Sequence, residues 1–152
     1  MGGGAAMNEV NERLVQAAIA ATHNAYAPYS NFHVGAALLL DDGKIVTGAN
    51  FENASYGMTL CAETVAIAKA NSDGQMRRIV AIAVAGGPKS SEGGALIGAE
   101  PITPCGRCRQ VIKEVADEVA IDLPVHCAHA SGYETHLLSE LLPYGFGPAN
   151  LK

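Results

Sequence analysis

The segments Cys61-Ala62-Glu63 and Pro104-Cys105-Gly106-Arg107-Cys108-Arg109-Gln110 carry the strongest pattern in this sequence. Cys105 and Cys108 are separated by two residues, so both sulfur atoms can face one point in the first turn of a helix, and Cys61 is expected to begin another helix. Three cysteines placed in this way predict a site for one zinc ion whose fourth position stays open to water. Glu63 is placed to move protons beside that position. The pattern therefore predicts a hydrolytic metal centre.

A Cys-x-x-Cys pair alone is a weak signal, because redox pairs, structural zinc sites and chance all produce it. Here Pro104 directly precedes the pair, and the other segment supplies a cysteine followed two residues later by a glutamate. A ligand-x-Glu segment followed later by Pro-Cys-x-x-Cys is the signature of zinc-dependent nucleobase deaminases. The structural alternative for Glu63, a carboxylate that only complements a helix dipole, carries less weight beside a metal ligand.

Length and composition describe one domain. The chain has 152 residues, 49% of them apolar, which is enough for a single core without disulfides. The formal net charge of −5 argues against a general nucleic-acid surface, because phosphate binding needs clustered Lys and Arg. We find no apolar run of membrane-spanning length and no secretion signal, and four cysteines with metal-like spacing predict a reducing, cytoplasmic location. Residues 1–7 are expected to be a tail or a cloning remnant.

Hydrophobic periodicity predicts a mixed order of strands and helices. The expected elements are a helix over residues 9–23, strands over 33–40 and 45–49, a helix over 59–70, a strand over 79–85, a helix over 106–119, short strands over 124–128 and 134–137, and a short helix over 138–142. The Asp-Gly pair between the first two strands predicts an antiparallel hairpin. Residues 86–101 are rich in Gly, Ser and Pro and are expected to form a flexible loop. This order predicts a mixed sheet with helices packed against it.

From about residue 9 to residue 151, the chain resembles the small homotetrameric zinc-dependent cytidine deaminases. Besides the cysteine segments, the resemblance rests on the stretch from Pro28-Tyr29-Ser30 to Ala37, the stretch from Gly48-Ala49-Asn50 to Tyr56, and the tail from Glu140 to Pro148. It implies an α/β fold of three layers, in which a mixed five-stranded sheet carries helices on both faces, within a domain spanning residues 8–152. It also implies a homotetramer whose subunits share active sites.

The same resemblance implies hydrolysis of cytidine and deoxycytidine to uridine and deoxyuridine plus ammonia, using water activated by zinc, in pyrimidine salvage. It assigns Cys61, Cys105 and Cys108 to zinc and the proton transfers to Glu63. The residues that it assigns to substrate are Asn50 and Glu52 at the ribose 3′-hydroxyl, Phe32 against the pyrimidine, the Ala62 backbone N–H at the ring O2, and Ala54, Tyr56 and Phe146 at a neighbouring subunit's substrate. Without the resemblance, Phe32 and Phe146 would be interpreted as core residues. Asn50 and Glu52 are two residues apart and can point to the same side to meet one hydroxyl, and the alternative for them is ordinary loop polarity.

The sequence departs from the family pattern at one position beside the metal ligands. The family usually has Arg directly after the glutamate, where it offsets thiolate charge, and this chain has Thr64. Arg107 and Arg109 are the two candidates for compensation. Blasticidin S deaminase, a relative, also lacks that arginine and shares the Pro-Cys-Gly-Arg-Cys-Arg-Gln segment, so a modified aminated pyrimidine nucleoside is the alternative substrate. Residues 86–101 also form a longer loop than is usual in the family.

A hypothesis from another class is a zinc-stabilised binding module without catalysis. That hypothesis requires a closed site with four protein ligands, in which the fourth ligand is Cys127 or one of the histidines near the C-terminus. Cys127 has no partner at ligand spacing and is expected to be a buried, inert thiol. His126, His129 and His136 are expected to be surface or hydrogen-bonded histidines rather than ligands of a second metal.

Overall fold

The computed structural model describes residues 2–151 of the chain. Its helices and strands are α1 (Gly2–Ala21), β1 (Phe32–Leu40), β2 (Ile45–Ala49), α2 (Ala62–Ser72), β3 (Ile79–Pro88), α3 (Gly106–Val119), β4 (Pro124–His129), β5 (Gly132–Leu137) and α4 (Leu138–Leu141), and short 3-10 turns span Thr22–Asn24, Tyr56–Met58, Met76–Arg78 and Pro148–Leu151. No helix in this described part is both long and apolar enough to cross a membrane.

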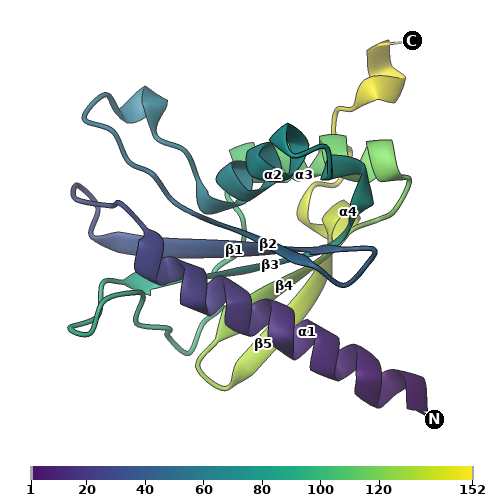
Figure 1. Cartoon of the computed structure of the whole chain (residues 1–152). Helices are drawn as coiled ribbons and strands as arrows, with labels where there is room; N and C mark the ends of the chain where they lie inside the picture. The colour runs from purple at the N-terminus through teal and green to yellow at the C-terminus, as the bar shows by residue number, and fades with distance from the viewer. Residues whose placement is uncertain (1, 152) are drawn as a thin grey trace.

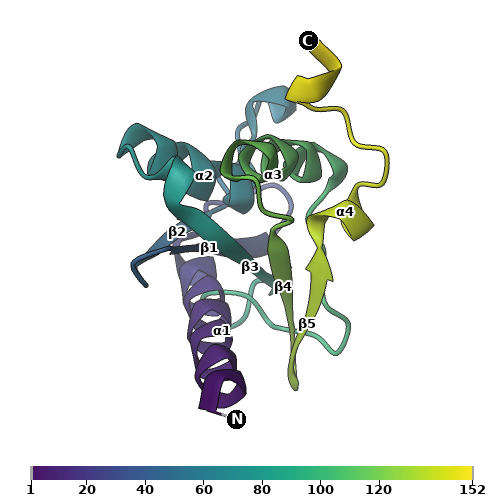
Figure 2. The same ribbon diagram turned by 90° about the vertical axis from the view of Figure 1, so that its right-hand side faces the viewer.

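The five strands form one mixed sheet in the order β2-β1-β3-β4-β5. All neighbouring strands pair antiparallel except β3 and β4, which run parallel. The parallel pair requires the chain to cross over the sheet, and α3 lies within that crossover. Helix α1 covers one face of the sheet, and α2, α3 and α4 lie on the other (Figures 1 and 2). The predicted three-layer α/β fold is confirmed.

Two apolar clusters fill the spaces between these layers. The cluster between the sheet and helices α2 and α3 includes Leu38, Ile82 and Ile112, each fully buried. The cluster under α1 includes Leu14 and several alanines from β1 and β3. Small side chains under α1 allow that helix to approach the sheet closely.

Two glycines set how closely the helices approach. A Cβ atom on Gly35 of β1 would lie 2.1 Å from the Ala18 carbonyl oxygen of α1. A Cβ atom on Gly48 of β2 would lie 2.5 Å from the Ala66 nitrogen and 2.7 Å from the Ala62 oxygen of α2. All three distances are shorter than the contacts that real Cβ atoms make, so each helix sits where a side chain is missing from the strand.

Most predicted boundaries agree with the structure, and the largest differences lie at the starts of two helices and at the end of β3, which was expected at residue 85 but lies at Pro88. Helix α2 was expected from residue 59 but begins at Ala62, because Cys61 adopts an extended conformation before the first turn. Helix α1 was expected from residue 9 but begins at Gly2. Ala5, Ala6 and Met7 are good helix formers and extend it by nearly two turns, although Met7 remains 64% exposed. The expected domain start at residue 8 therefore remains a prediction, and Met1 lies outside the described residues.

Replacement of Gly35 by Ala should destabilise the fold, because its new methyl group collides with backbone of α1. We expect the free energy of unfolding to fall by on the order of 3 kcal/mol, the upper end of overpacking costs. Urea denaturation measures this change. Gly98→Ala is the matched control, since a Cβ there meets nothing within 4 Å. Equal stability of the two variants would contradict the close approach.

Candidate metal centre

The starts of α2 and α3 bring the two cysteine segments together. Cys61 caps α2 and Cys105 caps α3, both in extended backbone conformation. Their carbonyl oxygens accept the first helical hydrogen bonds, from Val65 N–H at 3.0 Å and from Arg109 N–H at 2.9 Å. The thiols therefore sit at two helix N-termini, where the dipole and free backbone N–H groups favour thiolate.

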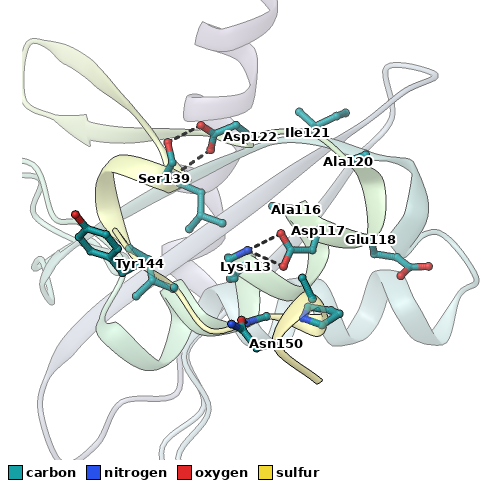
Figure 3. Close-up of a pocket in the computed structure, with 16 residues that line it drawn as sticks. Lys113, Ala116, Asp117, Glu118, Ala120, Ile121, Asp122, Ser139, Tyr144 and Asn150 are labelled. Carbon is teal, nitrogen blue, oxygen red and sulfur yellow. Dashed lines mark hydrogen bonds and ion pairs between the residues drawn. The ribbon is translucent and has the colours of Figure 1, made fainter. Parts of the chain in front are cut away.

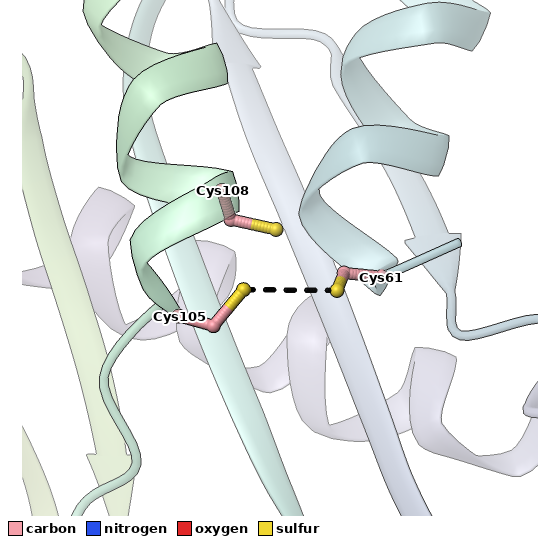
Figure 4. Close-up of side chains that lie close together, drawn as sticks. All are labelled: Cys61, Cys105 and Cys108. Carbon is pink, nitrogen blue, oxygen red and sulfur yellow. Dashed lines mark hydrogen bonds between the residues drawn. The ribbon is translucent and has the colours of Figure 1, made fainter. Parts of the chain in front are cut away.

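The three sulfur atoms form one compact cluster (Figure 4). The Sγ atoms of Cys61 and Cys105 are 3.8 Å apart, and all three lie within 4.8 Å of one another. Zn–S bonds of about 2.3 Å at tetrahedral angles place ligand sulfurs about 3.8 Å apart, whereas a disulfide needs about 2 Å. The donor set and its spacing therefore fit Zn²⁺. Among the residues described, no fourth Cys, His, Asp or Glu joins the cluster.

The thiols of Cys61 and Cys108 differ in how readily they lose a proton. Hydrogen bonding with Cys108, followed by that with Cys105, lowers the pKa of Cys61 to about 6 against the opposing effect of burial. The same hydrogen bond with Cys61, together with burial, raises the pKa of Cys108. The positive charge of Arg107 contributes a smaller lowering at Cys61. A negative charge at this point is thus already favoured by the surrounding groups.

Glu63 lies beside the cluster in the first turn of α2. It is 3% exposed, and burial raises the pKa of its carboxyl group. Cys61, Cys105 and Glu63 together line a hollow of about 240 Å³. A buried carboxyl group and two thiols that face the same small hollow can act on one bound molecule.

Of the residues predicted to contact substrate, three line this hollow: Phe32, Asn50 and Ala62. Phe32 is 36% exposed and Ala62 is fully buried. The Asn50 side chain connects the hollow to β1, since its Oδ1 accepts from Val34 N–H and its Nδ2 donates to the Phe32 carbonyl, both at 2.9 Å. Asn50 thereby holds the backbone of the first three residues of β1.

Glu52 lies near the hollow but outside its lining. Its Oε1 accepts from the backbone N–H groups of Tyr29 at 3.0 Å and Ser30 at 3.1 Å. Burial raises the pKa of Glu52, but hydrogen bonds from Ser30 and Tyr29 outweigh it, so the net pKa is lowered. The side chain is therefore a charged anchor for the turn that precedes β1.

The other three predicted contact residues do not line the hollow. Ala54 and Tyr56 lie in an exposed segment before α2, and Phe146 lies in the C-terminal tail, 56% exposed. Tyr56 is 76% exposed and packs edge-on against Tyr29, with ring centroids 6.0 Å apart. The structure of a single chain does not bring these side chains to the metal cluster.

Several residues that the sequence did not single out complete the hollow. Its further lining residues are Val34, Thr59, Leu60, Val84, Ile102 and Thr103. Ile102 and Thr103 follow the long loop, whose path back to the sheet no local pattern indicates. Arg109 holds this segment, since its guanidinium donates to the Pro104 carbonyl at 2.7 Å and to the Thr103 hydroxyl at 3.0 Å.

The fourth-ligand hypothesis is wrong for the residues that it named. Cys127 is buried in a small apolar cluster with Val84 and Val125, and burial first, then nearby carboxylates, raises the pKa of its thiol to about 11. His126 pairs with the Thr135 hydroxyl at 2.8 Å, and His136 with the Glu134 carboxylate at 2.8 Å. None of these side chains belongs to the metal cluster.

A larger hollow, of about 750 Å³, lies between α3, α4 and the C-terminal tail (Figure 3). Three of its charged groups already have partners, since Lys113 contacts Asp117 at 2.6 Å and Asp122 accepts a hydrogen bond from the Ser139 backbone N–H at 3.0 Å. It contains none of the cysteines and no residue of the smaller hollow. Size alone does not make it the site, because, in the described part of the chain, its lining brings no carboxyl group next to a group of metal-binding side chains.

Comparison with known proteins points in one direction. Residues 8–121 match the family described as "Cytidine and deoxycytidylate deaminase zinc-binding region". A cytidine deaminase from Halalkalibacterium halodurans is 45% identical over 136 residues, 89% of this chain and 92% of the relative. One from Sporosarcina psychrophila is 42% identical over 92% of this chain and 93% of the relative. The crystal structure of cytidine deaminase from Burkholderia pseudomallei superposes with a TM-score of 0.74 at 42% identity, covering 88% of this chain and 97% of that one.

Glu52 gives a prediction about stability and pH. Because its folded pKa is lowered below the ordinary 4.5, its charge stabilises the fold above that pH, and the contribution is lost as pH falls through the folded pKa. Glu52→Gln should therefore be less stable than wild type by about 1 kcal/mol at pH 7 and nearly equal to it at pH 3. Urea denaturation at both pH values tests this, with the exposed Glu92→Gln as control. A constant difference at both pH values would refute the role of charge.

Proposed function

The chain belongs to the cytidine and deoxycytidylate deaminase family, and from this premise we propose how its residues deaminate cytidine and deoxycytidine. The chain is a zinc-dependent hydrolytic deaminase. The observation that carries the proposal is one shared hollow, which is lined by the buried Glu63 and by Cys61 and Cys105 of the three-cysteine cluster. The carboxyl group that can transfer protons and the cysteines that can hold the metal thus lie at the same place.

In the proposed reaction, Cys61, Cys105 and Cys108 hold zinc. Bound zinc supplies a Lewis acid that lowers the pKa of a water molecule toward neutrality. Glu63 accepts a proton from the attacking water and delivers it to N3 of the pyrimidine. A new bond joins the water oxygen to C4. Glu63 then takes the second proton from this oxygen, which becomes the C4 carbonyl, and passes it to the exocyclic nitrogen, whose bond to C4 breaks as ammonia leaves. Burial of Glu63 keeps bulk water from competing for these protons.

We assign the substrate's base and sugar to different parts of the hollow. Phe32 packs against the pyrimidine, and the Ala62 backbone N–H at the start of α2 meets the ring O2. Asn50 and Glu52 bind the ribose 3′-hydroxyl. The Asn50 amide retains a second N–H and a second lone pair after its two backbone contacts, and Glu52 uses only Oε1 for its own, which leaves capacity for a hydroxyl.

The charge of the hollow favours a free nucleoside over a nucleotide. Among the described residues, its lining includes no Lys or Arg, and Glu63 adds negative charge. A phosphate group would need a cation or several donors in that position. The relatives reported above are named cytidine deaminases, and a modified nucleoside such as blasticidin S is accordingly not favoured.

We further propose that the chain works as a homotetramer with shared sites. Four exposed aromatic side chains form two pairs, Tyr26 with Phe51 and Tyr29 with Tyr56, whose ring centroids are 5.9 and 6.0 Å apart. Exposed aromatic residues in a group are typical of protein interfaces. A second subunit covering them would bring Ala54, Tyr56 and Phe146 toward a neighbouring substrate.

A place in the cytoplasm and in pyrimidine salvage completes the proposal. Four free cysteines, three of them clustered, require a reducing compartment to remain thiols. Nucleosides arise there from the breakdown of nucleic acids, and deamination returns the cytosine nucleosides to the uracil pool.

Replacement of Glu63 by Gln tests the reaction directly. We expect kcat for cytidine and deoxycytidine, followed by ultraviolet absorbance, to fall by about 10²–10⁴-fold, since the amide cannot carry protons. Zinc content should remain about one ion per chain. Glu114→Gln, an exposed substitution on α3, is the control. Retained activity in Glu63→Gln would refute the proton transfers, and absence of turnover of any cytosine nucleoside by wild type would refute the function.

Tyr56 tests the shared site. Native mass spectrometry of wild type should give four chains per particle, and Tyr56→Ala should dissociate the particle or raise KM about 10-fold, because an anchor at an interface is lost. Ile121→Ala, an apolar truncation at a 40% exposed position on the other hollow, should change neither. A fully active monomer would contradict the proposal.

A further inference from the structure

Thr64 contacts the metal cluster from the opposite helix to Cys108. Its hydroxyl oxygen lies 3.6 Å from the Cys108 sulfur. The two residues hold equivalent positions, since each is the third residue of its helix after a capping cysteine, Cys61 for α2 and Cys105 for α3. The Thr64 hydroxyl group thus occupies the position in α2 that the Cys108 sulfur occupies in α3.

The direction of this hydrogen bond follows from the chemistry of the ligand. A thiol in this cluster could donate or accept, but a cysteine bound to zinc is deprotonated and its sulfur can only accept. The Thr64 hydroxyl must then donate to the Cys108 thiolate. A hydrogen bond to a charged group contributes more than one between neutral groups.

The cluster needs such a donor because negative charge accumulates there. Three thiolates around Zn²⁺ leave a net charge of −1, and the Glu63 carboxylate lies beside them. The Arg109 guanidinium donates to the oxygens of Pro104, Thr103 and Leu141, at 2.7 to 3.0 Å, rather than to a sulfur. Arg107 is exposed and acts on Cys61 only through its charge.

We infer that Thr64 is a positioning residue of the metal centre, whose hydroxyl donates to the Cys108 thiolate, holds that ligand in place and withdraws negative charge from it. This inference rests on the proposed function, since it takes the three cysteines as the zinc ligands. The sequence left open which group compensates for the family arginine that Thr64 replaces. In the structure, the neutral hydroxyl of Thr64 contacts the buried Cys108 sulfur, whereas Arg109 does not. Partners of metal ligands typically change metal affinity by about 10–100-fold when removed.

The test compares substitutions that separate the hydroxyl group from the methyl group. Thr64→Val keeps the shape and removes the donor, whereas Thr64→Ser keeps the donor. We expect Thr64→Val to release zinc to a chelator about 10-fold faster than wild type. In the Co²⁺-substituted protein, its thiolate-to-metal absorption band should move to longer wavelength, because a thiolate without the hydrogen bond gives up charge more easily. Thr64→Ser should match wild type in both measurements.

Thr47→Val on β2 is the matched control, a Thr→Val change at a half-buried position away from the cluster, and should leave both readouts unchanged. If Thr64→Val folds poorly by circular dichroism, Thr64→Ala removes the same hydroxyl at a lower cost to the helix and should give the same band shift. Wild-type values in the variants without a hydroxyl would overturn the inference, as would equal defects in Val and Ser.

Measurements on the wild-type protein distinguish failure of this inference from failure of the proposed function. A thiolate-to-cobalt band and one zinc per chain in wild type, without a change in Thr64→Val, would remove only the role of Thr64. If the wild-type protein showed neither the thiolate-to-cobalt band nor bound zinc, the three cysteines would not be a zinc site, and both the proposed function and the inference would be refuted.

Discussion

The meeting of two helix N-termini is the constraint on which the site depends. Cys61 and Cys105 are 44 residues apart in the chain, yet each caps a helix whose start faces the other. The positive ends of two helix dipoles therefore converge on one point. Without a negative charge there, the two helix ends would repel each other. Thiolates at this point relieve that repulsion, so the ligands and the helices stabilise one another. Glu63 owes its position to the same geometry, because it lies in the first turn of α2.

The sheet order explains why the two helix starts meet. Strand β2 lies at one edge of the sheet, and α2 packs over the face of β2 and β1. Helix α3 belongs to the crossover between the parallel strands β3 and β4, so it must lie on the same face and begin near the carboxyl end of β3. Ligand sites of α/β folds commonly occur at the carboxyl ends of parallel strands, where helices begin. The hollow lined by Val84 and Cys105 is such a place.

Local patterns in the sequence predicted local structure well. The Asp-Gly turn and the alternation around it placed the hairpin of β1 and β2 correctly, and the apolar spacing after Cys105 predicted the bounds of α3, residues 106–119. Cys61 was expected at a helix start, although α2 begins three residues later than periodicity suggested, because Thr59 and Leu60 are extended. The spacing of the cysteines was informative because it reflects the geometry of a metal rather than of the chain.

Contacts between distant segments could not be predicted in the same way. Ile102 and Thr103 line the hollow because a long loop returns to the sheet and Arg109 fixes its end. Both arginines beside the second cysteine pair were candidates for charge compensation, and only their surroundings separate them. The contact of Thr64 with Cys108 joins two helices whose relative position is set by the whole sheet. Such contacts depend on tertiary geometry, for which one sequence offers no local signal.

Gly48 shows that a residue without chemistry can govern the site. The main chain of α2 at Ala62 and Ala66 rests directly on its bare Cα, so the absent side chain sets the height of Cys61 and Glu63 above the sheet. Any side chain at that position lifts the start of α2 away from the start of α3, and the three sulfurs no longer converge. Selection on catalysis alone would therefore keep Gly48 as strictly as the metal ligands, and in a mutational scan scored by turnover it would be indistinguishable from them.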